Sequence, residues 1–195
     1  MKTILAFILS LFALSAQADW YAGAGVGLAN DEIATNLVVG HGLNKYFSVE
    51  TGFADFGESK DIFSNSTNDN TNTSRFLQET LTKREALSLS AVAKLPLIID
   101  DGMGVYIIGR AGFARWRSSY TIKNTTMVFQ NEPPGGVVST ESSIIYGKLS
   151  GFDAVLAAGI EAAIENTFSI RLEYSRHVIN SESISGITMN VMFIF

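Results

Sequence analysis

The sequence predicts an all-β protein, a single eight-stranded antiparallel up-and-down transmembrane β-barrel. Apolar and polar residues alternate in eight segments, and a period of two is typical of strands, whose successive side chains point to opposite faces. The segments are about 9–11 residues long or slightly longer, as tilted transmembrane strands require. Hydrophobic residues make up 47% of the chain, but beyond the N-terminus no apolar run reaches the roughly 18 residues of a membrane helix. A barrel, with apolar residues outside and polar residues inside, fits this composition.

The first residues have the pattern of a secretory signal peptide. Lys2 supplies a positive charge, 4–14 is apolar, and Ala16-Gln17-Ala18 is a small-x-small cleavage site. The apolar run is too short for a membrane-spanning helix. The sequence has no cysteine, so we expect neither a lipid anchor at the cleavage site nor disulfides or thiolate metal sites. We therefore expect a signal peptide at 1–18 and a barrel domain at 19–195.

The first four predicted strands alternate clearly. In the first strand, Tyr21 and three glycines share one face, and the glycines leave room inside the barrel for bulky neighbours. In the fourth, leucine and alanine alternate with serine and lysine between Leu87 and Leu95. Pro96 is expected to end it, because proline has no N–H for the ladder. These strands are Trp20–Ala29, about Thr35–Gly42, Tyr46–Phe56 and Lys83–Leu95.

The last four predicted strands include the clearest alternation in the chain. From Phe168, aromatic and aliphatic residues alternate with Ser169, Arg171, Glu173 and Ser175. In the closing strand, every odd position from Ile187 onward is apolar. The strands are Val105–Trp116, Phe152–Ile164, one over 168–175, and Ile184–Phe195.

The connections between the predicted strands alternate in length. Three are short (Leu43–Lys45, Leu97–Met103 and Glu165–Thr167), and Gly57–Thr82 and Arg117–Gly151 are long. An even number of strands puts both termini on the side of the short turns. The segment 65–74 has no apolar residue, so we expect it to be mobile. Apolar residues on both sides of 133–136 predict that the other long connection extends as a hairpin.

Six charged residues lie in the middle of predicted strands, opposite the apolar face. A charge on the lipid face costs about 2–4 kcal/mol at mid-bilayer, so we expect all six inside the lumen. An eight-stranded barrel is just wide enough for side chains to fill, and three acids can neutralise three bases. We expect Arg171 to bridge two carboxylates, with Lys94 sharing one. The six are Glu50, Lys94, Arg110, Glu161, Arg171 and Glu173.

Several segments together resemble the transmembrane domain of the outer-membrane protein A family. The most specific is Arg171-Leu172-Glu173-Tyr174, which follows a Gly-x-Glu strand. The resemblance implies a charge cluster that plugs the lumen, matched here by Glu50, Lys94, Glu161 and Arg171, with Arg110 and Glu173 adjoining. It also implies that the terminal Phe195 is read during barrel assembly. The other matching segments are 20–24, 46–53, 93–96, 105–110 and 158–164.

The resemblance implies a location in the bacterial outer membrane, with periplasmic termini and extracellular long loops. Many family members continue into a peptidoglycan-binding domain, and wall tethering is not expected for a chain that stops at Phe195. The expected partners are outer-membrane lipids and lipopolysaccharide, the barrel-assembly machinery, and a host or phage ligand at the external loops. We expect a monomer without cofactors. A net charge of −5 argues against nucleic-acid binding.

The expected function is non-enzymatic, with a role in membrane integrity and surface interaction. One alternative is a low-conductance pore gated by the charge cluster. A second is a lipid-A-modifying enzyme, because Glu173, Ser175 and His177 share the inward face near the external end of one strand. Residues two apart on a strand face approach the reach that a nucleophile and base require.

Overall fold

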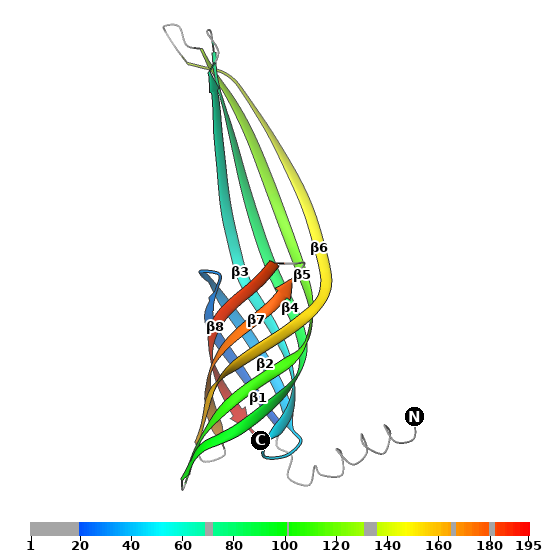
Figure 1. Ribbon diagram of the computed structural model, residues 1–195. Helices are drawn as coiled ribbons and strands as arrows, with labels where there is room; N and C mark the ends of the chain where they lie inside the picture. Colours follow the sequence, from blue (N-terminus) through cyan, green and yellow to red (C-terminus); the bar gives the residue numbers. More distant parts are fainter. Residues whose placement is uncertain (1–19, 69–71, 101, 131–135, 165–166, 180–181) are drawn as a thin grey trace, which may run out of the picture. The chain divides into compact units, whose positions relative to one another are not determined.

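The computed structural model describes residues 20–68, 72–100, 102–130, 136–164, 167–179 and 182–195, so the predicted signal peptide lies outside the described residues. The strands form a closed antiparallel ring in sequence order, as predicted (Figure 1). They are β1 Trp20–Ala29, β2 Glu32–Gly42, β3 Phe47–Asn68, β4 Asn72–Asp100, β5 Met103–Gln130, β6 Val137–Ile164, β7 Phe168–Ile179 and β8 Glu182–Ile194.

The chain divides into two compact units. The first is the barrel, which comprises the residues up to Gly57 together with Glu85–Trp116 and Ser150–Phe195. The second comprises Glu58–Arg84 and Arg117–Leu149. Each unit is described separately below.

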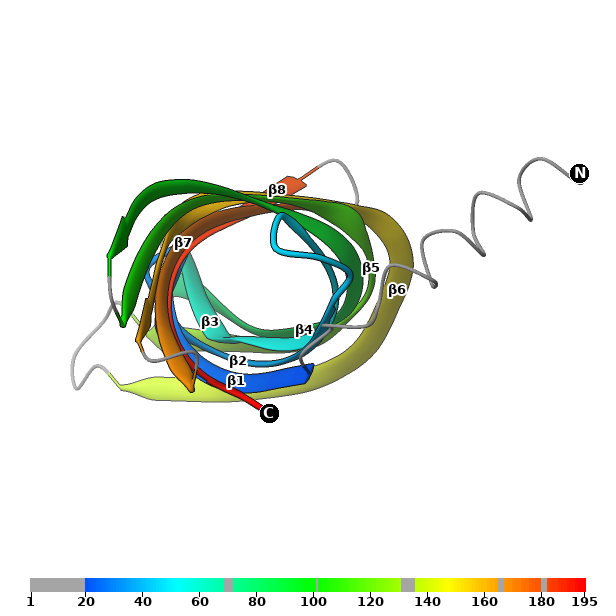
Figure 2. The same ribbon diagram turned by 90° about the horizontal axis from the view of Figure 1, so that it is seen from below.

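The barrel closes where its first and last strands meet. β1 pairs with β8 from Tyr21↔Ile194 to Ala29↔Gly186, and the ring is seen end-on in Figure 2. At the end of this seam, the Trp20 amide donates to the Phe195 carbonyl at 3.0 Å, and the Phe195 amide donates to the Trp20 carbonyl at 2.8 Å. A closed ring leaves no strand edge exposed, as a backbone surrounded by hydrocarbon requires.

The turn between β1 and β2 is tighter than the sequence predicted. Asn30 and Asp31 both have positive φ, 48° and 70°, which is the backbone of a two-residue type I′ turn. Ala29 therefore pairs directly with Glu32, and β2 begins three residues before the predicted Thr35. Asn and Asp tolerate this conformation better than other non-glycine residues.

Pro96 does not end β4, contrary to the prediction. The Lys94 amide donates to the Tyr46 carbonyl at 2.7 Å, immediately before the start of β3. Amides two residues apart point to the same side of a strand, so the Pro96 nitrogen faces a side where β3 offers no further residue. A proline is tolerated there because no ladder hydrogen bond is lost, and β4 continues to Asp100.

The second unit consists of parts of β3, β4, β5 and β6. The expectation of a mobile loop at 65–74 is wrong for its described residues, since 65–68 and 72–74 belong to strands. The predicted hairpin is confirmed, with β5 reaching Gln130 and β6 starting at Val137. A hydrogen bond from Lys60, whose Nζ lies 2.5 Å from Glu79 Oε1, lowers the pKa of Glu79. In this unit Gln78 Nε2 of β4 donates a hydrogen bond to Asn124 Oδ1 of β5 at 3.1 Å.

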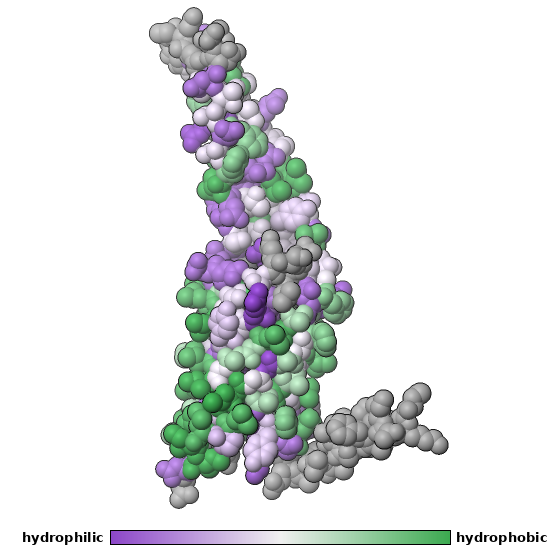
Figure 3. All heavy atoms as spheres, viewed as in Figure 1, coloured by the Kyte–Doolittle hydropathy of each residue, from purple (hydrophilic) through white to green (hydrophobic). Residues whose placement is uncertain are grey.

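Side chains alternate along the barrel strands as predicted. On β7, Arg171 is 2% exposed, whereas its neighbour Leu172 is 46% exposed. Apolar side chains gather over the barrel strands in Figure 3. In the described part of the chain, no helix is long and apolar enough to cross a bilayer.

Candidate functional site

Arg171 is the centre of a buried ionic network inside the barrel. Its Nη1 lies 2.7 Å from Glu50 Oε1, and its Nε donates to Glu161 Oε2 at 2.9 Å. Lys94 Nζ donates to the other oxygen of Glu161 at 2.7 Å. Glu161 and Arg171 are directly opposite each other on β6 and β7, whereas Glu50 comes from β3 and Lys94 from β4. The network therefore ties together four of the eight strands.

Arg110 and Glu173 form a separate ion pair. Arg110 Nη2 lies 2.5 Å from Glu173 Oε1, and both side chains are at most 8% exposed. Glu173 is two residues beyond Arg171 on the same inward face of β7. The structure thus brings all six sequence-predicted charges into the lumen as a four-residue network and a pair. Within this set of six, three carboxylates face three bases, so their formal charges balance.

Tyr21 of β1 is hydrogen-bonded to this four-residue network, a contact that was not identified from the sequence. Its hydroxyl donates to Glu50 Oε1 at 2.6 Å and lies 2.9 Å from Ser48 Oγ. Its ring lies 5.3 Å from the Lys94 ammonium. Tyr21 is opposite Gly40 on β2, and a Cβ on that glycine would collide with the tyrosine ring. In the sequence, Tyr21 is marked as a candidate because it is the one large residue on a strand face that otherwise consists mainly of glycines.

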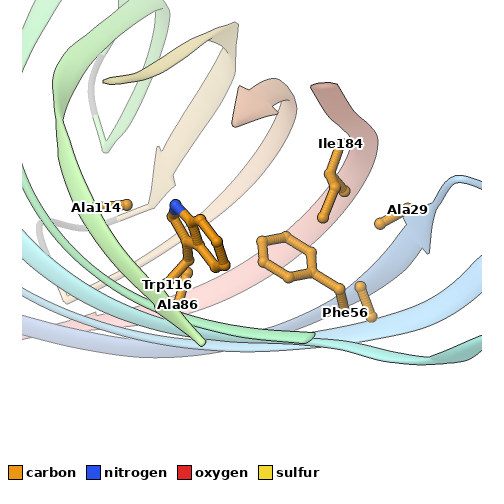
Figure 4. Packing of buried hydrophobic residues seen from close by; sticks show 7 residues of the cluster. Ala29, Phe56, Ala86, Ala114, Trp116 and Ile184 are labelled. Carbon is orange, nitrogen blue, oxygen red and sulfur yellow. The ribbon is translucent and has the colours of Figure 1, made fainter. Parts of the chain in front are cut away.

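An apolar layer closes the lumen at a second position. Phe56 of β3, Trp116 of β5 and Ile184 of β8 point toward one another across the barrel (Figure 4). Trp116 Nε1 donates to Asp153 Oδ2 at 2.6 Å, which fixes the indole. Every member of the layer is at most 8% exposed. The remaining members are Ala29, Ala34, Ala86 and Ala114.

A small cavity of about 30 Å³ lies between the ionic groups and the apolar layer, since Arg110, Phe56 and Ile184 all line it. A cavity of this size holds one or two water molecules. His177 also lines it, with its ring 4.9 Å from that of Phe56 in an edge contact. Among the described residues, no partner is found for His177 Nδ1.

The residues of the lipid-A-modifying alternative do not form a nucleophile–base pair. Ser175 and His177 are both buried, and no hydrogen bond joins them in the described part of the chain. Glu173 is bound to Arg110. The adjoining cavity is too small for a lipid substrate. No group of three acidic, histidine or cysteine residues suited to a metal ion is found among the residues described.

Phe195 and His41 lie at the end of the barrel where Trp20 meets Phe195. The Phe195 side chain is 74% exposed, so its backbone alone contributes to the seam. The His41 ring lies 4.6 Å from that of Trp20. Both side chains are away from the ionic network.

Comparison with solved structures finds chains that are similar over most of this sequence. The N-terminal β-barrel domain of OprF from Pseudomonas aeruginosa is 12% identical, with 91% of this chain and 97% of that chain covered and a TM-score of 0.55. Ail of Yersinia pestis, in complex with a heparin analogue, is 12% identical over 91% and 97% of the two chains, with a TM-score of 0.47. CarO of Acinetobacter baumannii is 12% identical over 89% and 97%, also with a TM-score of 0.47.

No curated protein sequence matches the chain. Residues 3–195, by contrast, match the outer membrane protein beta-barrel domain family. This match covers nearly the whole sequence and agrees with the closed eight-stranded ring. The chain therefore belongs to the outer membrane protein β-barrel domain family and is a bacterial outer-membrane β-barrel.

Proposed function

We propose that this protein has a non-enzymatic role in the outer membrane, in membrane integrity and in recognition at the cell surface. Residues 1–18 direct its export, the termini are periplasmic, and the connections that contain the second unit are extracellular. Trp20, the first described residue, and Phe195 pair on the side of the short turns, which supports this orientation.

The observation that carries the recognition role is the exposed edge of β6. The β6–β7 register pairs Val155 with His177, and β7 ends at Ile179. Continuing this register leaves the residues of β6 before about 153 without a β7 residue opposite. Within this stretch Ile144, Ile145 and Tyr146 are 51–75% exposed. An exposed apolar strand edge is a surface that a partner strand can extend.

The test of this role is adhesion by cells that display the full protein. Ile144→Lys with Tyr146→Lys should abolish most attachment to host-cell layers or immobilised surface proteins, because the apolar edge is lost. Ser139→Lys with Ser143→Lys adds the same charge to β6 but removes no apolar group, and it should attach like the wild type. Equal adhesion by all three proteins, at equal surface amounts, would reject the recognition role.

The closed lumen supports a structural role over the pore alternative. An ion would have to pass both the ionic network and the apolar layer, which are separated only by a small cavity. The lipid-A-modifying alternative is not favoured, because Ser175 and His177 lie inside the barrel with no room for a lipid. Mass spectrometry of lipid A from cells with and without the protein should show no difference.

A further inference from the structure

A groove runs over the outer surface of the barrel strands β4, β5 and β6. Its volume is about 640 Å³, and it is open to the surroundings. Side chains at its base are small, so the strand backbones lie close to whatever fills it. These residues are Ala91 and Ala93 of β4, Gly109 and Ala111 of β5, and Ala158 of β6.

Larger side chains border this groove. Phe47, Leu156 and Tyr174 contribute apolar surface. All three are exposed on the outside of the barrel, where they would face lipid. The groove is therefore shaped and lined for a hydrocarbon chain, whose dispersion contacts with the wall increase when small residues let it approach closely.

One of the outward-facing residues that line the groove is charged. Arg176 lies directly opposite Leu156 in the β6–β7 register, faces outward and lines the groove. It is two residues beyond Tyr174, toward the end of β7 that is away from the termini. An outward arginine is tolerated only near the membrane interface, where its cost falls to about 0–1 kcal/mol.

A second outward arginine lies toward the same end of the barrel. Arg115 of β5 is exposed, and its guanidinium carbon is 5.9 Å from the centroid of the Phe152 ring. No carboxylate is found among the outward residues of β5 from Met103 to Arg115 or of β7 from Phe168 to Arg176. This part of the barrel surface therefore favours an anionic group.

We propose that the groove and the two arginines form a binding site for the lipid A part of lipopolysaccharide. An acyl chain would occupy the groove, and Arg176 and Arg115 would each bind a phosphate. β5 and β7 are separated by β6, so the two strands are on the order of 10 Å apart. Arg115 contacts Phe152 and Arg176 is opposite Leu156, four residues further along β6, which adds roughly 13 Å along the strands. Lipid A carries phosphates at both ends of a disaccharide and can engage two separated guanidiniums, whereas phosphatidylglycerol has a single phosphate. Arginine suits this role because its planar fork binds phosphate bidentately.

The site deepens the proposed function and rests on its orientation, because lipopolysaccharide occupies the outer leaflet. The binding test itself does not depend on orientation. Full-length protein refolded into phosphatidylcholine nanodiscs would be titrated with bisphosphorylated lipid A, dephosphorylated lipid A or phosphatidylglycerol, and the bound lipid counted by native mass spectrometry. Each arginine near a charged lipid surface contributes about fivefold in affinity. Arg176→Gln with Arg115→Gln should therefore weaken lipid A binding by about 20-fold or more.

Two further variants complete the design. Ala111→Leu with Ala158→Leu fills the groove and should weaken binding of both forms of lipid A. Lys45→Gln removes an exposed positive charge at the turn near the termini and should leave binding unchanged. The proposal fails if the arginine variant binds lipid A as strongly as Lys45→Gln does, or if phosphatidylglycerol competes equally with lipid A. It also fails if the groove instead binds a second copy of the chain. That outcome would appear as a dimer that is lost in the leucine variant. A surface-labelling result that showed the opposite orientation would overturn the proposed function, but it would leave the measured affinity for lipid A unchanged.

Discussion

Glu161 lies directly opposite Arg171 across the β6–β7 ladder and accepts hydrogen bonds from Arg171 Nε at 2.9 Å and from Lys94 Nζ at 2.7 Å. One carboxylate is thus shared by two bases from different strands. Burial of an ion pair is costly unless the remaining hydrogen-bonding capacity is satisfied, and here each Glu161 oxygen has a cationic partner. Glu161 should therefore be the most sensitive member of the ionic network.

Removal of Glu161 should destabilise the barrel strongly. Glu161→Ala leaves Lys94 without a carboxylate, and breaking a buried pair in this way typically costs about 3–5 kcal/mol. Lys94→Ala in the same protein removes the orphaned charge and should recover part of that loss. Urea unfolding of the four proteins of this cycle in lipid vesicles would measure the coupling. Additive effects would show that the two residues do not depend on each other.

The ionic network could be predicted from the sequence because a charged side chain on a membrane-spanning strand avoids lipid only by pointing into the lumen. Alternation on β7 assigned Arg171 and Glu173 to the lumen, and the same argument applied to residues on β3, β4, β5 and β6. Tyr21 was missed because the alternation gave its face but not its partner, and its part in the network follows only from its hydrogen bond to Glu50.

The apolar layer and the strand lengths could not be predicted in this way. The alternation puts Phe56 on the face of Glu50 and Trp116 on the face of Arg110, but their meeting with Ile184 depends on the closure of the ring. The predicted end of β3 at Phe56 and the predicted start of β4 at Lys83 were placed where the alternation of apolar and polar residues stops. This alternation is expected only where one face of a strand is in contact with lipid. Both strands continue with polar residues whose ladder hydrogen bonds leave no pattern of hydrophobicity.

Opening the lumen should require two changes. Glu161→Ala with Lys94→Ala removes part of the ionic network but leaves the apolar layer closed. Phe56→Ala with Trp116→Ala removes the largest side chains of that layer but leaves the charges in place. Single-channel recording should show the closed behaviour of the wild type for each pair and steps of conductance for the fourfold variant. If the network variant alone conducts steadily, the apolar layer is not a barrier and the pore alternative gains support.

The proposed orientation can be tested by placing single cysteines in a chain that has none. Ser143 is exposed on β6 in the second unit, and Asp100 ends β4 near the turn to β5. On intact cells, a membrane-impermeant maleimide should label Ser143→Cys but not Asp100→Cys. After permeabilisation both should react, which shows that each site is accessible. Labelling of Asp100→Cys on intact cells would reverse the topology.

Phe195 should affect barrel assembly more than barrel stability. Its side chain is 74% exposed and its backbone makes the hydrogen bonds with Trp20, so Phe195→Ser preserves the closing seam. Phe193 on the adjacent β8 is also outward, at 61% exposure, and Phe193→Ser provides a matched loss of one lipid-facing ring. If the assembly machinery recognises the final aromatic residue, Phe195→Ser should reduce the amount of folded barrel in the membrane several-fold. The refolded Phe195→Ser protein should nevertheless unfold at the same urea concentration as Phe193→Ser. Equal membrane levels for the two variants would show that Phe195 acts only as one more apolar contact with lipid.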